Sequence, residues 1–450
     1  MFTAFRIRIG TANPRLLRVA FLGALGLVVL LMSLKYAAKI EKPADNGLQS
    51  RSAFLRWRSM IHELFAGTNV YVGVHEYPNP PIMAIVLKPF ADLPPTAGAL
   101  TWFYAKVLMT AFAAVWVFRL VSPEIPDAAK ALAILLALPP ILGDLSHNNV
   151  NIFILFLVSG CLEAYRRGWS FTSGLVLALA IACKVTPLMF LAFFIYKRSA
   201  KAVLGCVAGL ILWLAIVPGL AFGWERNTEL MQSWYALMVK PSLVDNRVTS
   251  EHPNQSIPGV VFRLFTRSAS FVEYPDNIPT PAEFHNVADI GTDAARWVVK
   301  GCLVSFAILI LVTCRSPRGV RQGPRFAAEC SLIVIGMLLF SERTWKHHAV
   351  TLLLPFAVLS WIVIAGEASR RTRVLTIGIL AACAILTNLP GVLPRRAADL
   401  SMVYGSYTAA FLSLTIGVVV AAFSSKFEGI AGTVSDVQPV PQSEAAANSP

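Results

Sequence analysis

The feature that most constrains this chain is a series of long apolar runs, the first of them at residues 17–38. Runs of roughly 17–25 apolar residues have the length at which an α-helix crosses a bilayer. Of the 450 residues, 56% are hydrophobic and only 14% are charged, whereas soluble domains carry about 25% charged residues. The chain is therefore predicted to be an all-α polytopic membrane protein. A soluble enzyme, a secreted disulfide scaffold and a disordered chain are excluded as descriptions of the whole.

We expect about twelve spanning helices. After the first run, the candidates lie at roughly 96–119, 130–143, 151–165, 170–183, 185–197, 202–222, 297–314, 327–341, 348–366, 374–390 and 403–423. With the N-terminus inside, clusters of Arg and Lys fall in the short inner loops, as they do in membrane proteins generally. The sequence thus predicts a multi-pass protein of the cell membrane with both termini in the cytoplasm.

The predicted organisation has three parts. Residues 1–16 form a cytoplasmic N-terminus, and residues 17–426 form one transmembrane domain with long outer loops at about 39–95 and 223–296. Residues 427–450 are small, polar and contain proline, so we expect a disordered cytoplasmic tail.

Neither the net charge nor the cysteines indicate a nucleic-acid or zinc site. The formal charge of +14 would suggest nucleic acid in a soluble protein, but here basic loops orient the chain in a membrane. The seven cysteines fall in or beside apolar runs without a CxxC spacing, which is typical of small buried apolar residues. No nucleic-acid partner is expected.

The first outer segment has an unusual pattern. Residues 52–66 are predicted to form an amphipathic interfacial helix that also carries Arg56, Arg58 and Glu63. Its apolar positions, expected to face lipid, are Phe54, Trp57, Ile61, Leu64 and Phe65. The proline-rich stretch 77–81 cannot continue a helix, and the apolar piece 82–90 is predicted to be a re-entrant segment.

Clusters of polar residues lie between or beside the later apolar runs, on the predicted extracytoplasmic side. Asn148, Asn149 and Asn151 lie between two apolar runs and offer donors and acceptors suited to sugar hydroxyls; helix capping is the alternative explanation. Lys184 is flanked by apolar sequence, which favours a lysine facing a cavity or a partner, the alternative being a lysine that snorkels at a helix end.

Two further clusters lie at 252–256 and 341–348. The first contains Asn254 and Gln255, and the second contains Arg343 and the pair His347 and His348. Adjacent histidines do not share one face of a helix, and no metal-ligand spacing such as HExxH is present. We therefore expect no metal site.

In combination these clusters resemble glycosyltransferase family 87, the polyprenyl-phosphate-dependent, mannosyltransferase-like proteins of the GT-C superfamily. The resemblance spans roughly residues 50–360. Its motifs occur in the family's order: Gly67-Thr68-Asn69-Val70-Tyr71 with Tyr77-Pro78-Asn79-Pro80-Pro81, Asn148-Asn149-Val150-Asn151, Lys184-Val185-Thr186-Pro187, Asn254-Gln255-Ser256, and Ser341 to His348.

The resemblance implies an integral-membrane glycosyltransferase with a GT-C-type helical bundle. It would transfer a mannose-like hexose from a polyprenyl-phosphate donor to a glycan or glycolipid acceptor on the extracytoplasmic face, with the lipid-linked sugar as substrate and no cofactor. The cations Arg56, Arg58, Lys184, Arg343, His347 and His348 would bind the donor phosphate. Hydrogen bonds to the hydroxyls of the sugar or the acceptor would come from the amide residues Asn148, Asn149, Asn151, Asn254 and Gln255.

One departure concerns the catalytic base. The family commonly has an acidic residue early in the first outer segment, at the place that here reads Ala53-Phe54. The candidates that take its role are Glu76, then Asp45, then Glu63, although Glu63 can equally pair with a neighbouring arginine on the interfacial helix. A transporter or lipid flippase is the alternative function, and a scaffold without chemistry is a third.

Overall fold

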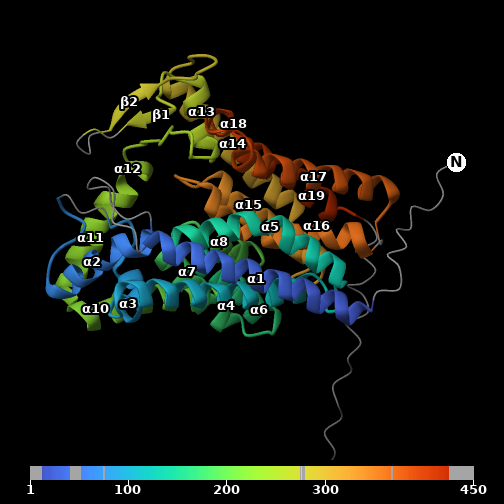
Figure 1. Cartoon of the computed structure of the whole chain (residues 1–450), viewed down its shortest axis with the longest axis horizontal. Coiled ribbons are helices and arrows are strands. Elements are labelled where there is room, and N and C mark those ends of the chain that lie inside the picture. The colour runs from blue at the N-terminus through green and yellow to red at the C-terminus, as the bar shows by residue number, and fades with distance from the viewer. Residues whose placement is uncertain are drawn as a thin grey trace, which may run out of the picture.

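The computed structural model is a bundle of helices that run side by side along its long axis (Figure 1). It describes residues 13–40, 52–73, 77–273, 275, 279–365 and 368–424. The shorter elements that connect these helices gather at one end of the bundle (Figure 1). The predicted tail after residue 426 and most of the predicted N-terminal segment lie outside the described residues.

Among the described residues, seven helices are long and apolar enough to cross a membrane. They are α1 (Pro14–Ile40), α4 (Pro95–Val121), α5 (Asp127–His147), the continuous segment Ala200–Phe222 made of α9, η2 and α10, α14 (Thr292–Thr313), Lys346–Ala365 made of η5 and α16, and α17 (Arg370–Val392). The pair α18 (Arg395–Val403) and α19 (Ser406–Ala422) is bent by 51° and would be the eighth span. The chain is thus a multi-pass helical membrane protein.

The expected count of about twelve spans is not confirmed. The remaining apolar runs do form helices, namely α6 (Asn151–Arg166), α7 (Ser170–Cys183), α8 (Leu188–Tyr196) and α15 (Pro324–Leu339). The longest of them has 16 residues and measures about 24 Å at the α-helical rise, which is less than the roughly 30 Å of a hydrocarbon core. Apolarity predicted the positions of these helices, but they are too short to be counted as spans by their length.

The elements at the end of the bundle come from the two long loops. The first loop forms α2 (Ala53–Ala66) and α3 (Pro81–Ala91). The second forms α11 (Trp224–Trp234), η3 (Tyr235–Val239), α12 (Lys240–Leu243), α13 (Ile257–Phe265) and a hairpin of β1 (Phe271–Glu273) with β2 (Thr280–Glu283). The strands pair antiparallel, with Val272 opposite Pro281. The all-α prediction is therefore correct apart from this short hairpin.

The amphipathic helix expected at 52–66 is present as α2, but its apolar face does not face lipid. Phe54, Trp57, Ile61 and Leu64 are at most 5% exposed within the protein, and only Phe65 is exposed. Leu55 donates its N–H to the Ser52 side chain, which caps the helix. The helix is thus packed into the bundle end instead of lying on a membrane surface.

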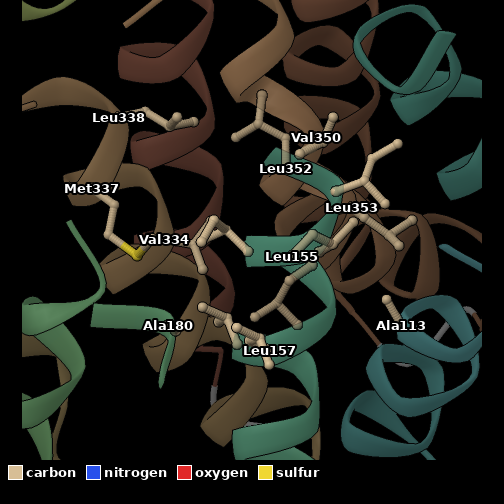
Figure 2. Close-up of a cluster of buried hydrophobic side chains, with 14 of the residues drawn as sticks. Ala113, Leu155, Leu157, Ala180, Val334, Met337, Leu338, Val350, Leu352 and Leu353 are labelled. Atoms are coloured by element: carbon tan, nitrogen blue, oxygen red, sulfur yellow. The ribbon is translucent and has the colours of Figure 1, made fainter. Parts of the chain in front are cut away.

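One cluster of buried hydrophobic side chains within the larger core lies where α6, α15 and η5 meet (Figure 2). Leu155, Val334 and Leu353 are among its side chains, each at most 2% exposed. Every residue of α15 except Arg325 is buried. The inner helices can therefore be short because other helices, rather than lipid, cover them.

Helices α7 and α9 are in close contact near the N-terminal end of α7. A Cβ added to Gly174 would lie 2.1 Å from the Ala202 carbonyl oxygen, and a Cβ on Gly205 would lie 2.1 Å from that of Phe171. Small residues that let backbones approach in this way drive helix association in membranes. Glycine is required at both positions.

We expect Gly205→Leu to lower the thermal unfolding temperature in detergent, because the larger side chain must push α9 away from α7. Gly301→Leu on α14 is the matched control, since nothing lies within 4 Å of a Cβ built there. Equal unfolding temperatures for the two variants would contradict the proposed close packing.

Candidate active site

A cavity of about 1020 Å³ lies between the bundle and the elements at its end. Its wall is built from α2, the break between α7 and α8, α11 to α14, and the segment between α15 and η5. Seven of the predicted site residues line it: Arg56, Asn149, Asn151, Lys184, Arg343, His347 and His348. Segments that are as much as 290 residues apart in the chain thus meet around one space.

Lys184 enters the cavity because the helix stops there. Helix α7 ends at Cys183, and Lys184 has extended backbone with φ −157° and ψ 124°. Pro187 lies at the start of α8, and proline cannot donate the hydrogen bond that would continue α7. The Lys184 side chain lines the cavity, and its Nζ donates to the Asn151 Oδ1 at 2.8 Å.

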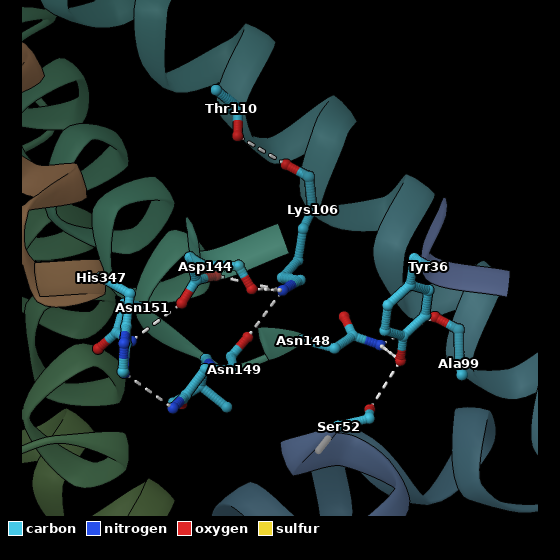
Figure 3. A network of polar contacts seen from close by, with 11 residues as sticks. Tyr36, Ser52, Ala99, Lys106, Thr110, Asp144, Asn148, Asn149, Asn151 and His347 are labelled. Carbon is cyan, nitrogen blue, oxygen red and sulfur yellow. Dashed lines mark hydrogen bonds and ion pairs between the residues drawn. The ribbon is translucent and has the colours of Figure 1, made fainter. Parts of the chain in front are cut away.

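A buried network holds Asn151 in place (Figure 3). Asn151 Nδ2 donates to Asp144 Oδ1 at 2.9 Å, and Lys106 Nζ lies 3.1 Å from Asp144 Oδ2. The side chains of Lys106 and Asp144 are both fully buried. Lys106 also donates to the carbonyl oxygens of Asp144 and Asn149, each at 3.0 Å.

Lys106 is not among the site residues predicted from the sequence. The signal was available, since a lysine in the middle of the apolar run 96–119 needs a partner inside the membrane. Asp144, between the next two apolar runs, is the carboxylate that such a lysine requires.

The three asparagines of the cluster have different environments. Asn149 and Asn151 line the cavity, and Asn149 Nδ2 lies 3.3 Å from His347 Nε2. Asn148 is fully buried and does not reach the cavity. It ends α5 with φ 53°, and its Nδ2 donates to the Tyr36 hydroxyl and the Ala99 carbonyl (Figure 3). The capping explanation therefore describes Asn148.

The two arginines of α2 differ in whether they reach the cavity. Arg56 lines the cavity, and burial lowers the pKa of its guanidinium. Arg58 does not line the cavity, and its Nη2 donates to the Leu93 carbonyl at 3.2 Å, just beyond α3. Arg58 thus ties α2 to α3 instead of reaching the donor site.

Asn254 and Gln255 do not reach the cavity either, because both side chains are fully buried. Asn254 Nδ2 donates to the Glu342 carbonyl at 2.9 Å, and its Oδ1 accepts from the Thr344 N–H at 2.9 Å. Gln255 Nε2 donates to the His252 and Met402 carbonyls. Both amide side chains are hydrogen-bonded to backbone groups. Their positions therefore do not support the expectation that they bind sugar hydroxyls.

The three expected base candidates are not in the described cavity wall. Asp45 and Glu76 lie outside the described residues. Glu63 is half-buried on α2 and does not line the cavity. The structure adds charged residues that the sequence analysis did not select: Arg247, Arg296, Lys300 and Glu342.

Across residues 13–40, 52–73, 77–273, 275, 279–365 and 368–424, no group of three or more His, Cys, Asp or Glu side chains is arranged to hold a metal. His347 and His348 lie with their ring centroids 4.9 Å apart at 88°.

A cavity with a largely apolar wall and mostly cationic charged residues lies at one end of this membrane-helix bundle, a combination suited to an amphipathic anionic ligand. The sequence model of glycosyltransferase family 87 matches residues 77–342. The chain belongs to this family, which confirms the resemblance drawn from its motifs.

Two characterised relatives are similar to this chain. Both are polyprenol-phosphate-mannose-dependent alpha-(1-2)-phosphatidylinositol mannoside mannosyltransferases. The protein from Mycolicibacterium smegmatis is 26% identical over 68% of this chain and 66% of its own length. The protein from Mycobacterium tuberculosis is 26% identical over 63% of this chain and 62% of its own length. The chain thus matches slightly less than two thirds of these relatives.

The crystal structure of ArnT from Cupriavidus metallidurans bound to undecaprenyl phosphate is also similar. It shares 12% sequence identity with a TM-score of 0.38, covering 94% of this chain and 80% of that chain.

Asp144→Leu is expected to destabilise the protein by about 3–5 kcal/mol, because it leaves Lys106 buried without its carboxylate. The measurement is thermal unfolding of the purified protein in detergent. The double variant Lys106→Met/Asp144→Leu should recover part of the loss, since both charges are then absent. A double variant less stable than Asp144→Leu would contradict the pairing.

Proposed function

We propose that this protein is a membrane glycosyltransferase with a GT-C-type fold. It transfers a mannose-like hexose from a polyprenyl-phosphate donor to a glycan or glycolipid acceptor at the extracytoplasmic face. Family membership and the names of the two relatives support the reaction class and the donor. The observation that carries the proposal is the convergence of Arg56, Lys184 and Arg343 on one large cavity at the bundle end.

The cations have the chemistry that the leaving group requires. When the glycosidic bond to the donor breaks, negative charge develops on the departing polyprenyl phosphate. Preorganised positive groups stabilise such charge, and Arg suits phosphate because its donors form a fork. Lys184 is held by Asn151 at 2.8 Å, so its ammonium is in position before the donor binds.

Neutral donors and acceptors line the same cavity beside these cations. Asn149 and Asn151 supply amides, and His347 and His348 supply imidazoles. In this proposal they bind the sugar hydroxyls and the phosphate. The reaction also needs a carboxylate to accept the acceptor's proton; the sequence ranks Glu76 first and Asp45 second for this role.

The transporter alternative lacks a supporting observation. Alternating access needs a path to both sides of the membrane, whereas the described cavity lies at the end where the two long loops gather. Uptake of free or lipid-linked sugar into sealed vesicles, without any transfer to an acceptor, would overturn the glycosyltransferase proposal.

Lys184→Ala should reduce transfer from polyprenyl-phosphate mannose by about 10²–10³, because it removes one preorganised donor for the leaving phosphate. The assay is incorporation of radiolabelled mannose into lipid or glycan acceptors by the purified protein. Lys201→Ala is the matched control, since Lys201 is exposed at the start of α9 and does not line the cavity. Full activity of Lys184→Ala would return Lys184 to the snorkelling explanation.

The membrane side of the cavity can be tested by labelling cysteines in intact cells. Arg296 on α14 lines the cavity, and exposed Arg318 follows the other end of that helix. Introduced cysteines at Arg247, in the cavity wall, and at Arg318 should therefore react with an impermeant maleimide from opposite sides, with Arg247→Cys labelled from outside. The background lacks Cys302, because the other native cysteines are buried. Labelling of Arg318→Cys alone would place the active site in the cytoplasm.

A further inference from the structure

Glu342 is the one acidic side chain among the described residues of the cavity wall. It lies in the turn after α15, and its neighbours Ser341, Arg343 and Trp345 also line the cavity. The side chain is 32% exposed, so it is sheltered yet accessible from the cavity. A carboxylate in this position can contact a ligand that the surrounding cations bind.

The backbone that carries Glu342 is held from two directions. Fully buried Asn254 donates to the Glu342 carbonyl and accepts from the Thr344 N–H, both at 2.9 Å. The Gln255 N–H donates to the Thr344 carbonyl at 2.7 Å, and the Thr344 hydroxyl donates to the Leu338 carbonyl at 2.6 Å. A base must be positioned before its proton affinity matters, and this clamp supplies the positioning.

The surroundings of Glu342 also adjust its proton affinity. Burial raises the pKa of the Glu342 carboxyl, and the nearby Arg343 opposes this effect. The Arg343 Nε lies 3.6 Å from Glu342 Oε1 and also donates to the Thr249 hydroxyl at 3.0 Å. A carboxylate with a raised pKa is a stronger base than an ordinary glutamate at the same pH.

The place where the family commonly has its acid offers no proton acceptor here. Ala53 is 1% exposed and begins α2, packed into the core. Among the described residues, Glu342 is the carboxylate that shares the cavity wall with Lys184 and Arg343.

We propose that Glu342 is the general base that deprotonates the acceptor hydroxyl; this rests on the proposed glycosyl transfer. The carboxylate takes the hydroxyl proton as the acceptor oxygen forms a bond to the anomeric carbon. The bond from that carbon to the phosphate oxygen breaks, and its electron pair leaves with the polyprenyl phosphate. Glu342 then returns the proton to water.

The test uses the full-length protein in nanodiscs with polyprenyl-phosphate mannose and the acceptor on which the wild type is active. Glu342→Gln should lower the transfer rate by about 10²–10⁴, the range that general bases contribute, while donor binding measured by titration is unchanged. The matched control is Glu225→Gln on α11, because Glu225 is exposed and outside the cavity wall; it should keep wild-type transfer.

The conservative variant separates catalysis from structure. Glu342→Asp should keep measurable transfer, and the acidic limb of its pH–rate profile should move to lower pH, because an aspartate is protonated at lower pH than the raised glutamate. A purely structural role would not move that limb. This readout remains decisive if Glu342→Gln unfolds at a lower temperature than the wild type.

The possible results distinguish a wrong assignment of the base from a wrong assignment of the reaction. Full transfer by Glu342→Gln overturns the base assignment while the glycosyltransferase function stands. If Glu76→Gln or Asp45→Asn then abolishes transfer, the base lies in the first loop, as the sequence ranking has it. A wild type that transfers sugar from no polyprenyl-phosphate donor overturns both proposals.

Discussion

The structure depends on one buried interaction, the pair of Lys106 and Asp144 inside the helix bundle. A charge that is moved out of water into the protein interior costs several kcal/mol unless a partner compensates it. The two side chains are fully buried 3.1 Å apart, and each uses its remaining capacity on the break between α5 and α6. Lys106 bonds the carbonyls of Asp144 and Asn149, and Asp144 accepts from Asn151. The pair therefore stabilises a break in regular helix at a depth where unpaired backbone groups are costly.

Hydrogen bonds connect this ion pair to the cavity wall. Asn151 accepts from Lys184 through the oxygen that Asp144 does not use, so the second lysine is oriented without a carboxylate of its own. Its ammonium is thus left with capacity for an anionic ligand. Helix α7 ends at Cys183, and the extended backbone of Lys184 takes its side chain out of the helix there.

The sequence predicted the helical membrane fold and much of the cavity wall for a physical reason. Polar residues inside apolar runs need water, partners or ligands, so Lys184, Asn149 and Asn151 could be recognised one by one. The number of spans was less predictable, because α6 and α15 are covered by protein and need not match the thickness of the bilayer. The prediction that the apolar face of α2 contacts lipid was wrong. An amphipathic pattern does not distinguish a helix that faces lipid from one that packs against a protein core.

The roles within polar motifs could not be read from composition. Asn148 and Asn149 are adjacent, yet one caps a helix and the other faces the cavity, because the left-handed backbone at Asn148 turns its side chain towards Tyr36. Likewise, Asn254 looks like a sugar-binding amide until its partners are known. All of its described bonds go to backbone or hold a turn, and such partners are set by tertiary structure alone.

The charge balance of the cavity limits what can occupy it. Arg56, Lys184 and Arg343 face it together with Arg247, Arg296 and Lys300, whereas Glu342 is the only acid among the described wall residues. Like charges that line one partly enclosed space raise its positive potential, and a neutral sugar would leave that potential uncompensated. In the proposed reaction, a phosphate-linked donor supplies the missing negative charge, and departure of the phosphate increases that charge where the cations are already placed. Groups that stabilise the breaking bond more than the bound donor speed the transfer instead of only tightening binding.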